Sequence, residues 1–219
     1  MKKLHIGLLI SLLSVFGLQG QTSHDELIKG LRSKMNEITG FEADALIKVD
    51  VDFIDISDRE VKVKYTAPDQ FEFDAKGIAL MPKNGMKMEY FSMLNAENII
   101  LPAGEEVIRE IQTQKLKVIP ESIDSDIVLA QLWMDPQTHR ILRMHTFTRE
   151  SGSYIIDFFF PKGSSILPSK IEVTFDIENL SAPAQMITEF MGNAKVDKDN
   201  LPKVAKVIVE YRNMIIHKR

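Results

Sequence analysis

The chain contains no cysteine among its 219 residues. This absence excludes disulfide bonds, thiol catalysis and cysteine metal ligands. It also excludes a lipobox signal, because such a signal needs a cysteine at the new N-terminus. An oxidising compartment remains compatible with the sequence, since disulfides are permitted there but are not required in a domain of this size.

The chain also lacks an apolar run of the roughly 20 residues that a membrane-spanning helix needs. Its N-terminus instead carries two lysines and then a shorter apolar core from Ile6 to Phe16, followed by Leu18 and Gly20 at positions that suit a cleavage site. We therefore predict a cleaved secretory signal peptide at residues 1–20 and a single domain at 21–219. The mature protein is expected in the periplasm, neither lipid-anchored nor membrane-spanning.

The chain also has no excess of basic residues over acidic ones. The chain has 27 Lys and Arg against 31 Asp and Glu, a net charge of −4, which becomes about −6 without the two lysines of the signal. An acidic protein has no electrostatic footprint for nucleic acid and is not attracted to anionic membranes by charge. The hydrophobic share of 44% is typical of a globular domain.

Catalytic motifs are absent too: there is no GxSxG elbow, no glycine-rich phosphate loop and no HExxH motif. His139 and His145 lack metal-ligand spacing, and residues 197–200 lack the glycine and the terminal glutamate of a calcium loop. A row of acidic residues could hold a cation but is better interpreted as the solvated face of a strand and its turn: Asp50, Asp52, Asp55 and Asp58. We predict a protein that is not an enzyme and has no cofactor or metal.

One helix is predicted near the start of the mature chain. Ser23 and Glu26 form a capping box, which predicts a helix from His24 to Ile38 that ends at Gly40. Its apolar residues recur at helical spacing on one face: Leu27, Leu31, Met35 and Ile38.

Most of the remaining chain alternates apolar and polar residues, which is typical of antiparallel strands with one wet face. Strands are predicted over 45–56, 60–65, 71–80, 127–134, 141–148, 154–160, 170–178 and 206–215, and strand patterns resume from Leu116 after the middle region. In that region 86–93 fits a strand or a short helix, and Glu105 to Gln112 resembles a brief helix. The fold class is mainly β (α+β), with one large antiparallel sheet that is strongly curved or closes into a barrel.

Surplus apolar surface is the main functional signal. Tyr154 to Phe160 is apolar on both faces, so both sides of this strand need a cover. Methionines cluster in the middle region and suit surfaces that adapt to varied apolar partners: Met81, Met86, Met88 and Met93. Helices packed on the sheet and methionines that fill gaps would explain both features equally simply.

The layout resembles the periplasmic lipoprotein carrier superfamily, the LolA/LolB-like proteins. The resemblance rests on a helix after the signal and on four weak motifs. These are VKVKYTAPDQFEF (61–73), the section from Leu132 to Phe160, LPSKI (167–171) and KVIVEYRNMII, which starts at Lys206.

The resemblance implies a half-open antiparallel β-barrel with helices as a lid in its concave face and acyl chains held between them. Lipoprotein carriers hold the lid with an arginine on an early strand. This chain offers Lys62 and Lys64 there, on the polar face, so no gating residue is assigned. The missing cysteine also argues against the role of the lipid-anchored receptors.

The predicted function is a periplasmic carrier or binding protein for a lipid or an acylated protein, with possible inner- or outer-membrane transport components as partners. We expect a monomer. The alternatives are a non-catalytic envelope interaction or regulatory module with a filled cavity and, less well supported, a lipid hydrolase. The predicted cavity lining is Val61, Val63, Phe71, Phe73, Met86, Met88, Phe158, Phe160, Val173 and Phe175.

Overall fold

The computed structural model describes residues 24–51, 57–68, 70–74, 97–123, 125–149, 152–163, 165–176 and 204–219. Its elements are α1 (His24–Asn36), β1 (Ile38–Val51), β2 (Arg59–Thr66), β3 (Gln70–Asp74), β4 (Asn98–Ile108), β5 (Ile111–Pro120), β6 (Ile127–Asp135), β7 (Arg140–Thr148), β8 (Ser153–Phe159), β9 (Lys170–Asp176) and β10 (Val204–Lys218). The predicted signal peptide, Met86, Met88 and residues 182–200 lie outside the described residues.

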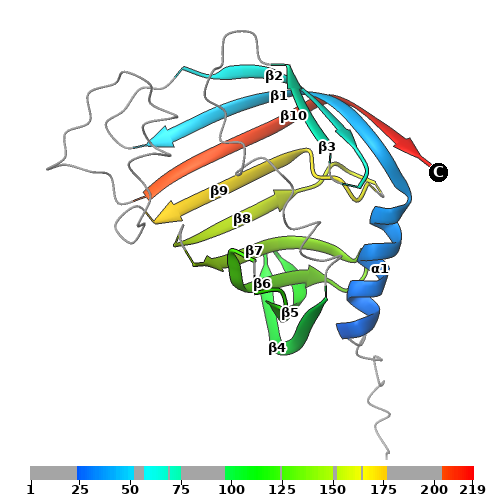
Figure 1. Cartoon of the computed structure of the whole chain (residues 1–219), viewed down its shortest axis with the longest axis vertical. Coiled ribbons are helices and arrows are strands. Elements are labelled where there is room, and N and C mark those ends of the chain that lie inside the picture. The colour runs from blue at the N-terminus through cyan, green and yellow to red at the C-terminus, as the bar shows by residue number, and fades with distance from the viewer. Residues whose placement is uncertain are drawn as a thin grey trace, which may run out of the picture.

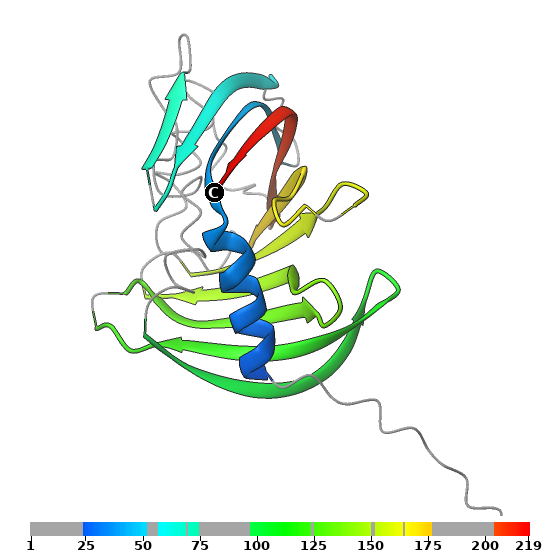
Figure 2. The same cartoon turned by 90° about the vertical axis from the view of Figure 1, so that its right-hand side faces the viewer.

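The ten strands form one antiparallel sheet in the order β3-β2-β1-β10-β9-β8-β7-β6-β5-β4. The sheet is strongly curved, and α1 runs past one end of its strands, from β1 towards β4 (Figures 1 and 2). The sheet does not close, because β3 and β4 end the order and do not pair with each other. The predicted curved antiparallel sheet is confirmed, whereas α1 is the only helix in the described ranges, so a lid of several helices is not shown.

The N-terminal helix forms where the sequence predicts it. Asp25 and Glu26 in its first turn and Lys34 in its last turn complement the helix dipole. The helix buries Leu27, Ile28, Leu31 and Met35 against the concave side of the sheet, and none of these four side chains exceeds 7% exposure.

The predicted end of this helix at Gly40 is wrong. The helix ends at Asn36, and Gly40 lies inside β1, which begins at Ile38 rather than at the predicted Ala45. A Cβ atom on Gly40 would lie 2.5 Å from the carbonyl oxygen of Tyr65 on the paired strand β2. Glycine is therefore required here by close approach of two strands and not by a helix cap.

The predicted helix from Glu105 to Gln112 is also wrong. These residues belong to β4 and β5, which pair along most of their length and are joined by Arg109 and Glu110. Both joining residues have positive φ, 48° and 65°, as a two-residue hairpin turn requires. The usual asparagine or glycine is missing from this turn, so the local sequence carries no hairpin signal.

The other predicted strands are confirmed where the structure describes them. The turn between β6 and β7 is held by Asp135, whose carboxylate accepts hydrogen bonds from the Gln137 backbone (2.9 Å) and the Thr138 hydroxyl (2.5 Å). In the part of the chain that is described, the one helix is too short and too polar to cross a membrane.

Candidate binding surface on the inner face of the sheet

The concave side of the sheet, here called the inner face, carries a continuous apolar surface. The strand register aligns one apolar residue from each of seven neighbouring strands in a single row from β1 to β5: Val49, Val207, Val173, Ile156, Met144, Leu132 and Leu116. All seven belong to the hydrophobic cluster that also contains the buried face of α1, or pack against it. The alternation of the strands thus builds one surface from distant segments.

Eight of the ten predicted lining residues lie in or against this cluster, and Met86 and Met88 are outside the described residues. The tightly buried members are Val61, Val63 and Phe158, with 3%, 2% and 2% exposure. The partly buried members are Phe71, Phe73, Phe160, Val173 and Phe175. The structure therefore brings the predicted residues together but divides them into packed and accessible positions.

Aromatic rings line the β1–β3 end of the inner face. Phe71 lies 4.7 Å from Tyr65 and 6.2 Å from Phe73, measured between ring centroids, and Phe41 lies 5.5 Å from Tyr65. Phe41 also meets Tyr211 of β10 edge to face at 6.2 Å, and burial raises the pKa of the Tyr211 phenol to about 12, so this phenol is neutral near pH 7.

Phe41 and Tyr65 also line this face, and neither was predicted as a lining residue. Phe41 was overlooked because a helix cap was assigned to Gly40, although the alternation of buried residues on β1 already begins at Phe41. Tyr65 ends a predicted strand, but its contacts with Phe41 and Phe71 depend on strand pairing that a single sequence does not reveal.

Close packing fastens α1 to the turn between β6 and β7. A Cβ atom on Gly30 would lie 2.5 Å from the imidazole ring of His139, so the ring occupies the space above the glycine. The Lys34 ammonium donates a hydrogen bond to the Thr138 carbonyl at 2.7 Å. His139 thus serves to dock the helix.

Two buried polar atoms at or beside the described inner face lack a hydrogen-bond partner. The hydroxyl of Thr146 on β7 is fully buried and has no hydrogen-bond partner, and the same holds for Nδ1 of His139. Within the described residues no group of three or more His, Asp or Glu side chains is arranged to hold a metal ion. The described inner face is thus suited to apolar contact and presents no evident catalytic group.

The opposite, outer face is held by charges and by a small second apolar cluster of Ile108, Trp133 and Leu142. Arg143 and Asp157 form a bidentate ion pair at 2.9 and 3.0 Å, whose hydrogen bonds raise the pKa of Arg143. The Arg109 guanidinium stacks 4.2 Å from the centre of the Phe159 ring and donates hydrogen bonds to the carbonyls of Leu142 and Phe158. Strand β8 is therefore covered on its outer side by cations, since Lys170 also lies 3.9 Å from the Phe159 ring centre.

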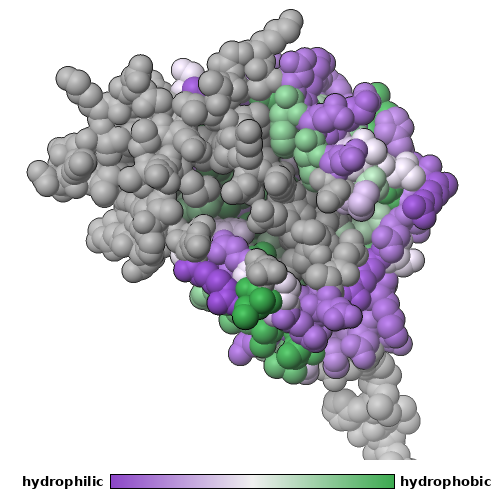
Figure 3. Space-filling view, viewed as in Figure 1, coloured by the Kyte–Doolittle hydropathy of each residue, from purple (hydrophilic) through white to green (hydrophobic). Residues whose placement is uncertain are grey.

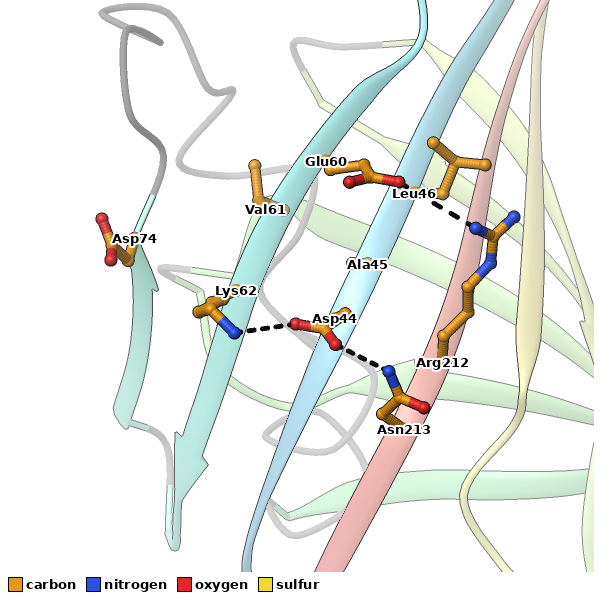
Figure 4. A pocket seen from close by; sticks show the side chains of 9 residues that line it. All are labelled: Asp44, Ala45, Leu46, Glu60, Val61, Lys62, Asp74, Arg212 and Asn213. Atoms are coloured by element: carbon orange, nitrogen blue, oxygen red, sulfur yellow. Dashed lines mark hydrogen bonds and ion pairs between the residues drawn. The ribbon is translucent and has the colours of Figure 1, made fainter.

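A shallow polar depression of about 480 Å³ lies on the outer face over β1, β2 and β10 (Figure 4). Asp44 accepts hydrogen bonds there from Lys62 at 3.1 Å and from Asn213 at 2.9 Å. These bonds, that from Asn213 foremost, lower the pKa of Asp44. Lys62 lies on the polar face, as predicted, and its charge is compensated by Asp44.

Hydrophobic side chains are also exposed at the β4 edge of the sheet. The space-filling view shows hydrophobic surface at its lower edge, where β4 to β6 lie (Figure 3). The exposed large hydrophobic residues of these elements and their connections include Ile99, Leu101, Ile123 and Val128. Ile123, in the connection between β5 and β6, is 83% exposed. Nothing in the structure shows what covers this patch.

No protein-family model matches the sequence, and no curated protein sequence matches it either. Solved structures do match. A domain attributed to an outer membrane lipoprotein-sorting protein of Vibrio parahaemolyticus is 8% identical, with 87% of this chain and 92% of that chain covered and a TM-score of 0.56.

Two further solved structures match this chain over a similar length and with similarly low sequence identity. A DUF1329 family protein from Desulfovibrio piger is 10% identical, with coverage of 88% and 92% and a TM-score of 0.54. A LolA superfamily protein from Nitrosomonas europaea is 7% identical, with coverage of 91% and 96% and a TM-score of 0.53. At these identities the likeness concerns the fold, and it extends over nearly the whole of each chain. The chain has a LolA-like fold.

Proposed function

We propose that this protein is a non-catalytic carrier or binding protein for a lipid, or for the acyl chains of a lipoprotein, and that it works in the periplasm. The observation that carries the proposal is the unbroken apolar row across the inner face, flanked by partly buried aromatic and aliphatic side chains. The LolA-like fold and a predicted signal peptide at 1–20 support it.

Acyl-chain binding needs no catalytic group. Each CH₂ that leaves water contributes about 0.8 kcal/mol, so a preformed apolar surface suffices to hold a chain. Val173 and Phe175 on β9 and Phe71 and Phe73 on β3 offer such a surface, because they pack against the cluster without being fully buried. In this proposal they contact the acyl chain.

The proposal includes a cover over the inner face. We assign that role to the segment that carries Met86 and Met88, together with α1, since methionine adapts to apolar partners of varied shape. Residues 21–219 then act as a single monomeric domain, and transport components of the inner or outer membrane receive or deliver the cargo.

A second candidate function is a protein-interaction or regulatory module whose interior is filled. The observation in its favour is that much of the inner face is closely packed. Leu132 and Met134 have no exposed surface, and Met144 and Phe158 have 2% each. Such a protein would carry no extractable ligand and would recognise its partner through its outer surface.

The first experiment is mass spectrometry of lipids extracted from the mature protein, purified from its native envelope without detergent. A stoichiometric acylated molecule supports the carrier. A protein free of lipid that also fails to take up a fluorescent fatty acid contradicts the carrier and favours the interaction module.

The surface is tested with Phe175→Asp, read by fatty-acid uptake and by thermal unfolding. We expect uptake to fall at least tenfold while the protein remains folded, because Phe175 is only partly buried. Phe158 is unsuitable, since at 2% exposure its replacement by a charged residue would unfold the protein. Thr174→Asp, one position along β9 on the outer face and opposite Lys206, is the matched control and should bind normally.

A further inference from the structure

The hydroxyl of Thr146 on β7 lies inside the protein without a hydrogen-bond partner. Thr146 has no exposed surface, and among the described residues no donor or acceptor pairs with its Oγ1 atom. A hydroxyl that leaves water on folding without gaining a partner costs free energy. In native structures such an atom needs a specific explanation, such as a functional role or a bound molecule.

Other threonines of the same sheet show the usual arrangement. Thr113 on β5 also has no exposed surface, but its hydroxyl donates a hydrogen bond to the Glu106 carbonyl at 2.5 Å. Thr148, two residues from Thr146 on the same strand, donates to the Gly152 carbonyl at 2.9 Å. Burial on this sheet is therefore compatible with a satisfied hydroxyl, and Thr146 is the exception among these three threonines.

Thr146 lies on the inner face, since it follows the inner residue Met144 by two positions on β7. Directly opposite it are Ala130 on β6 and Tyr154 on β8. The strand register extends this line of neighbours into a second inner row, next to the row from Val49 to Leu116: Val118, Ala130, Thr146, Tyr154, Phe175 and Ala205. All residues of both rows are uncharged.

The second row changes at Thr146 from packed to accessible positions. Val118 and Ala130, on one side of it, have no exposed surface. Tyr154 and Phe175, on the other side, are partly exposed, and their ring centroids lie 5.8 Å apart. Because Phe175 belongs to the surface proposed to contact the acyl chain, Thr146 lies one strand beyond Tyr154 at the border of that surface.

The surroundings of this hydroxyl decide which ligand group fits it. An alkyl chain would leave the hydroxyl unpaired. A carboxylate would bring a negative charge onto two rows that contain no cation, and burial of an unpaired charge is costly. A neutral carbonyl oxygen accepts the hydrogen bond and adds no charge, so an otherwise apolar molecule with one such oxygen is the best match.

We infer that the Thr146 hydroxyl donates a hydrogen bond to the carbonyl oxygen of an acyl ester, so that the ligand is an esterified acyl chain and not a free fatty acid. The inference rests on the proposed function. The acyl chain extends over Phe175 and Val173, and the ester reaches the hydroxyl when the ring of Tyr154, which is only partly buried, turns aside.

The test compares probes that differ in one group, by displacement of a fluorescent fatty acid from the mature protein. 1-Palmitoylglycerol carries the ester carbonyl, and 1-hexadecylglycerol has a CH₂ group in its place. Wild type should bind the ester about fivefold more tightly than the ether, the equivalent of one neutral hydrogen bond. Palmitate should bind more weakly than the ester, and tighter binding of palmitate would overturn the inference.

Thr146→Val keeps the shape of the side chain and removes the hydroxyl. It should bind ester and ether equally. It should not lower the midpoint of thermal unfolding, because the hydroxyl that it removes has no partner in the protein. Thr113→Val is the matched control, since the hydroxyl of this equally buried threonine is paired with the Glu106 carbonyl. It should lower the midpoint and keep the preference for the ester.

Three outcomes would each overturn the inference. They are equal binding of ester and ether by wild type, a preference for the ester that persists in Thr146→Val, and a loss of thermal stability in Thr146→Val as large as that in Thr113→Val. The last result would reveal a partner for the hydroxyl, such as a bound water. If wild type binds both probes equally and Phe175→Asp abolishes both, the inference fails and the carrier proposal stands. If wild type binds neither probe, both fail.

A second pair of probes distinguishes the two sources of an acyl ester. These are a dipalmitoylglyceryl-cysteine peptide and its dialkyl ether analogue. A preference for the ester peptide that disappears in Thr146→Val supports an acylated protein as the ligand. A preference confined to 1-palmitoylglycerol supports a free glycerolipid.

Discussion

The inner and outer faces of the same strands are stabilised by different interactions. On β6 and β7 the inner residues Leu132 and Met144 pack into the large hydrophobic cluster. Their outer neighbours Trp133 and Arg143 bond to carboxylates, and Trp133 also belongs to a second apolar cluster of only three buried residues. Apolar packing stabilises roughly in proportion to the area removed from water, while exposed ion pairs contribute little. Most of the folding free energy therefore comes from the inner face.

Strand β8 shows what this difference means for an apolar sequence. Its residues are apolar on both sides, which predicted a cover over each face. The inner residues Ile156 and Phe158 join the cluster, but the outer ring of Phe159 is covered by Arg109 and Lys170 through cation–π contacts. Long cationic side chains can thus cover an apolar strand where a packed layer was expected.

The largest effect should come from the inner face. Leu132→Ala removes a side chain with no exposed surface and should lower the free energy of unfolding by about 2–5 kcal/mol, as measured by urea denaturation. Gln131→Ala, on the outer face of the same strand, is the control and should change it by less than about 0.5 kcal/mol. Equal effects would remove the contrast between the two faces.

A smaller effect is expected at the strongest outer-face contact. Arg109→Gln loses the stacking on Phe159 and two hydrogen bonds to backbone carbonyls. Because Arg109 is partly in solvent, we expect a loss of about 1–2 kcal/mol. Glu110→Gln is the control, because it changes the neighbouring turn residue, which also has positive φ, and leaves Arg109 in place. A loss as large as that of Leu132→Ala would show that this outer-face contact contributes as much to the free energy of unfolding as a core side chain does.

The pH dependence of stability should carry a still smaller contribution from His145 on the outer face. Burial, and then the positive charges of Lys115 and Arg143, lower the pKa of His145 below its ordinary 6.5. The unfolded chain therefore takes up the proton first, so this stability is present above about pH 6.5 and is lost as the pH falls below it.

The measurement compares the free energy of unfolding at about pH 7.5 and about pH 5.5. His145→Gln should reduce the difference between the two values. An undiminished difference would show that other groups account for the acid sensitivity.

The smallest effect is expected at an exposed ion pair. Lys62→Ala removes the contact with Asp44, whose Nζ–Oδ1 distance is 3.1 Å, from a lysine that is 76% exposed. The free energy of unfolding should change by less than about 0.5 kcal/mol. Lys64→Ala, which removes the contact with Glu42 at 3.7 Å, should behave alike. A loss of several kcal/mol in either variant would contradict the assignment of stability to the inner face.

Local patterns predicted the parts of the fold that local forces build. The apolar face of α1 and the existence of β2, β6, β7 and β9 follow from periodicity, and the structure confirms these elements. On β2 the predicted alternation of buried and exposed residues is confirmed as well. The β4–β5 hairpin was missed because its turn residues, Arg109 and Glu110, adopt positive φ without being glycine or asparagine. Gly40 was misassigned because its constraint comes from Tyr65 on another strand.

The residues of the candidate site likewise fall into those that the sequence predicted and those that it did not. Val61, Phe73, Val173 and Phe175 could be named from the sequence, since alternation shows that one face of each strand is apolar. Which of these side chains stay accessible was not predictable, because exposure depends on neighbours contributed by other strands. Thr146 and His139, each with a buried polar atom that lacks a partner, were likewise beyond prediction.

Composition and periodicity established that this protein is mainly β, free of cysteine and apolar on one face of nearly every strand, because those properties reside in single residues and their immediate neighbours. The order of the strands, the row from Val49 to Leu116 and the docking of Gly30 on His139 arose only when distant segments packed together. Such contacts depend on which strands pair and in which register. Strand pairing is decided by the free energy of the whole folded chain, and local sequence patterns do not reveal it.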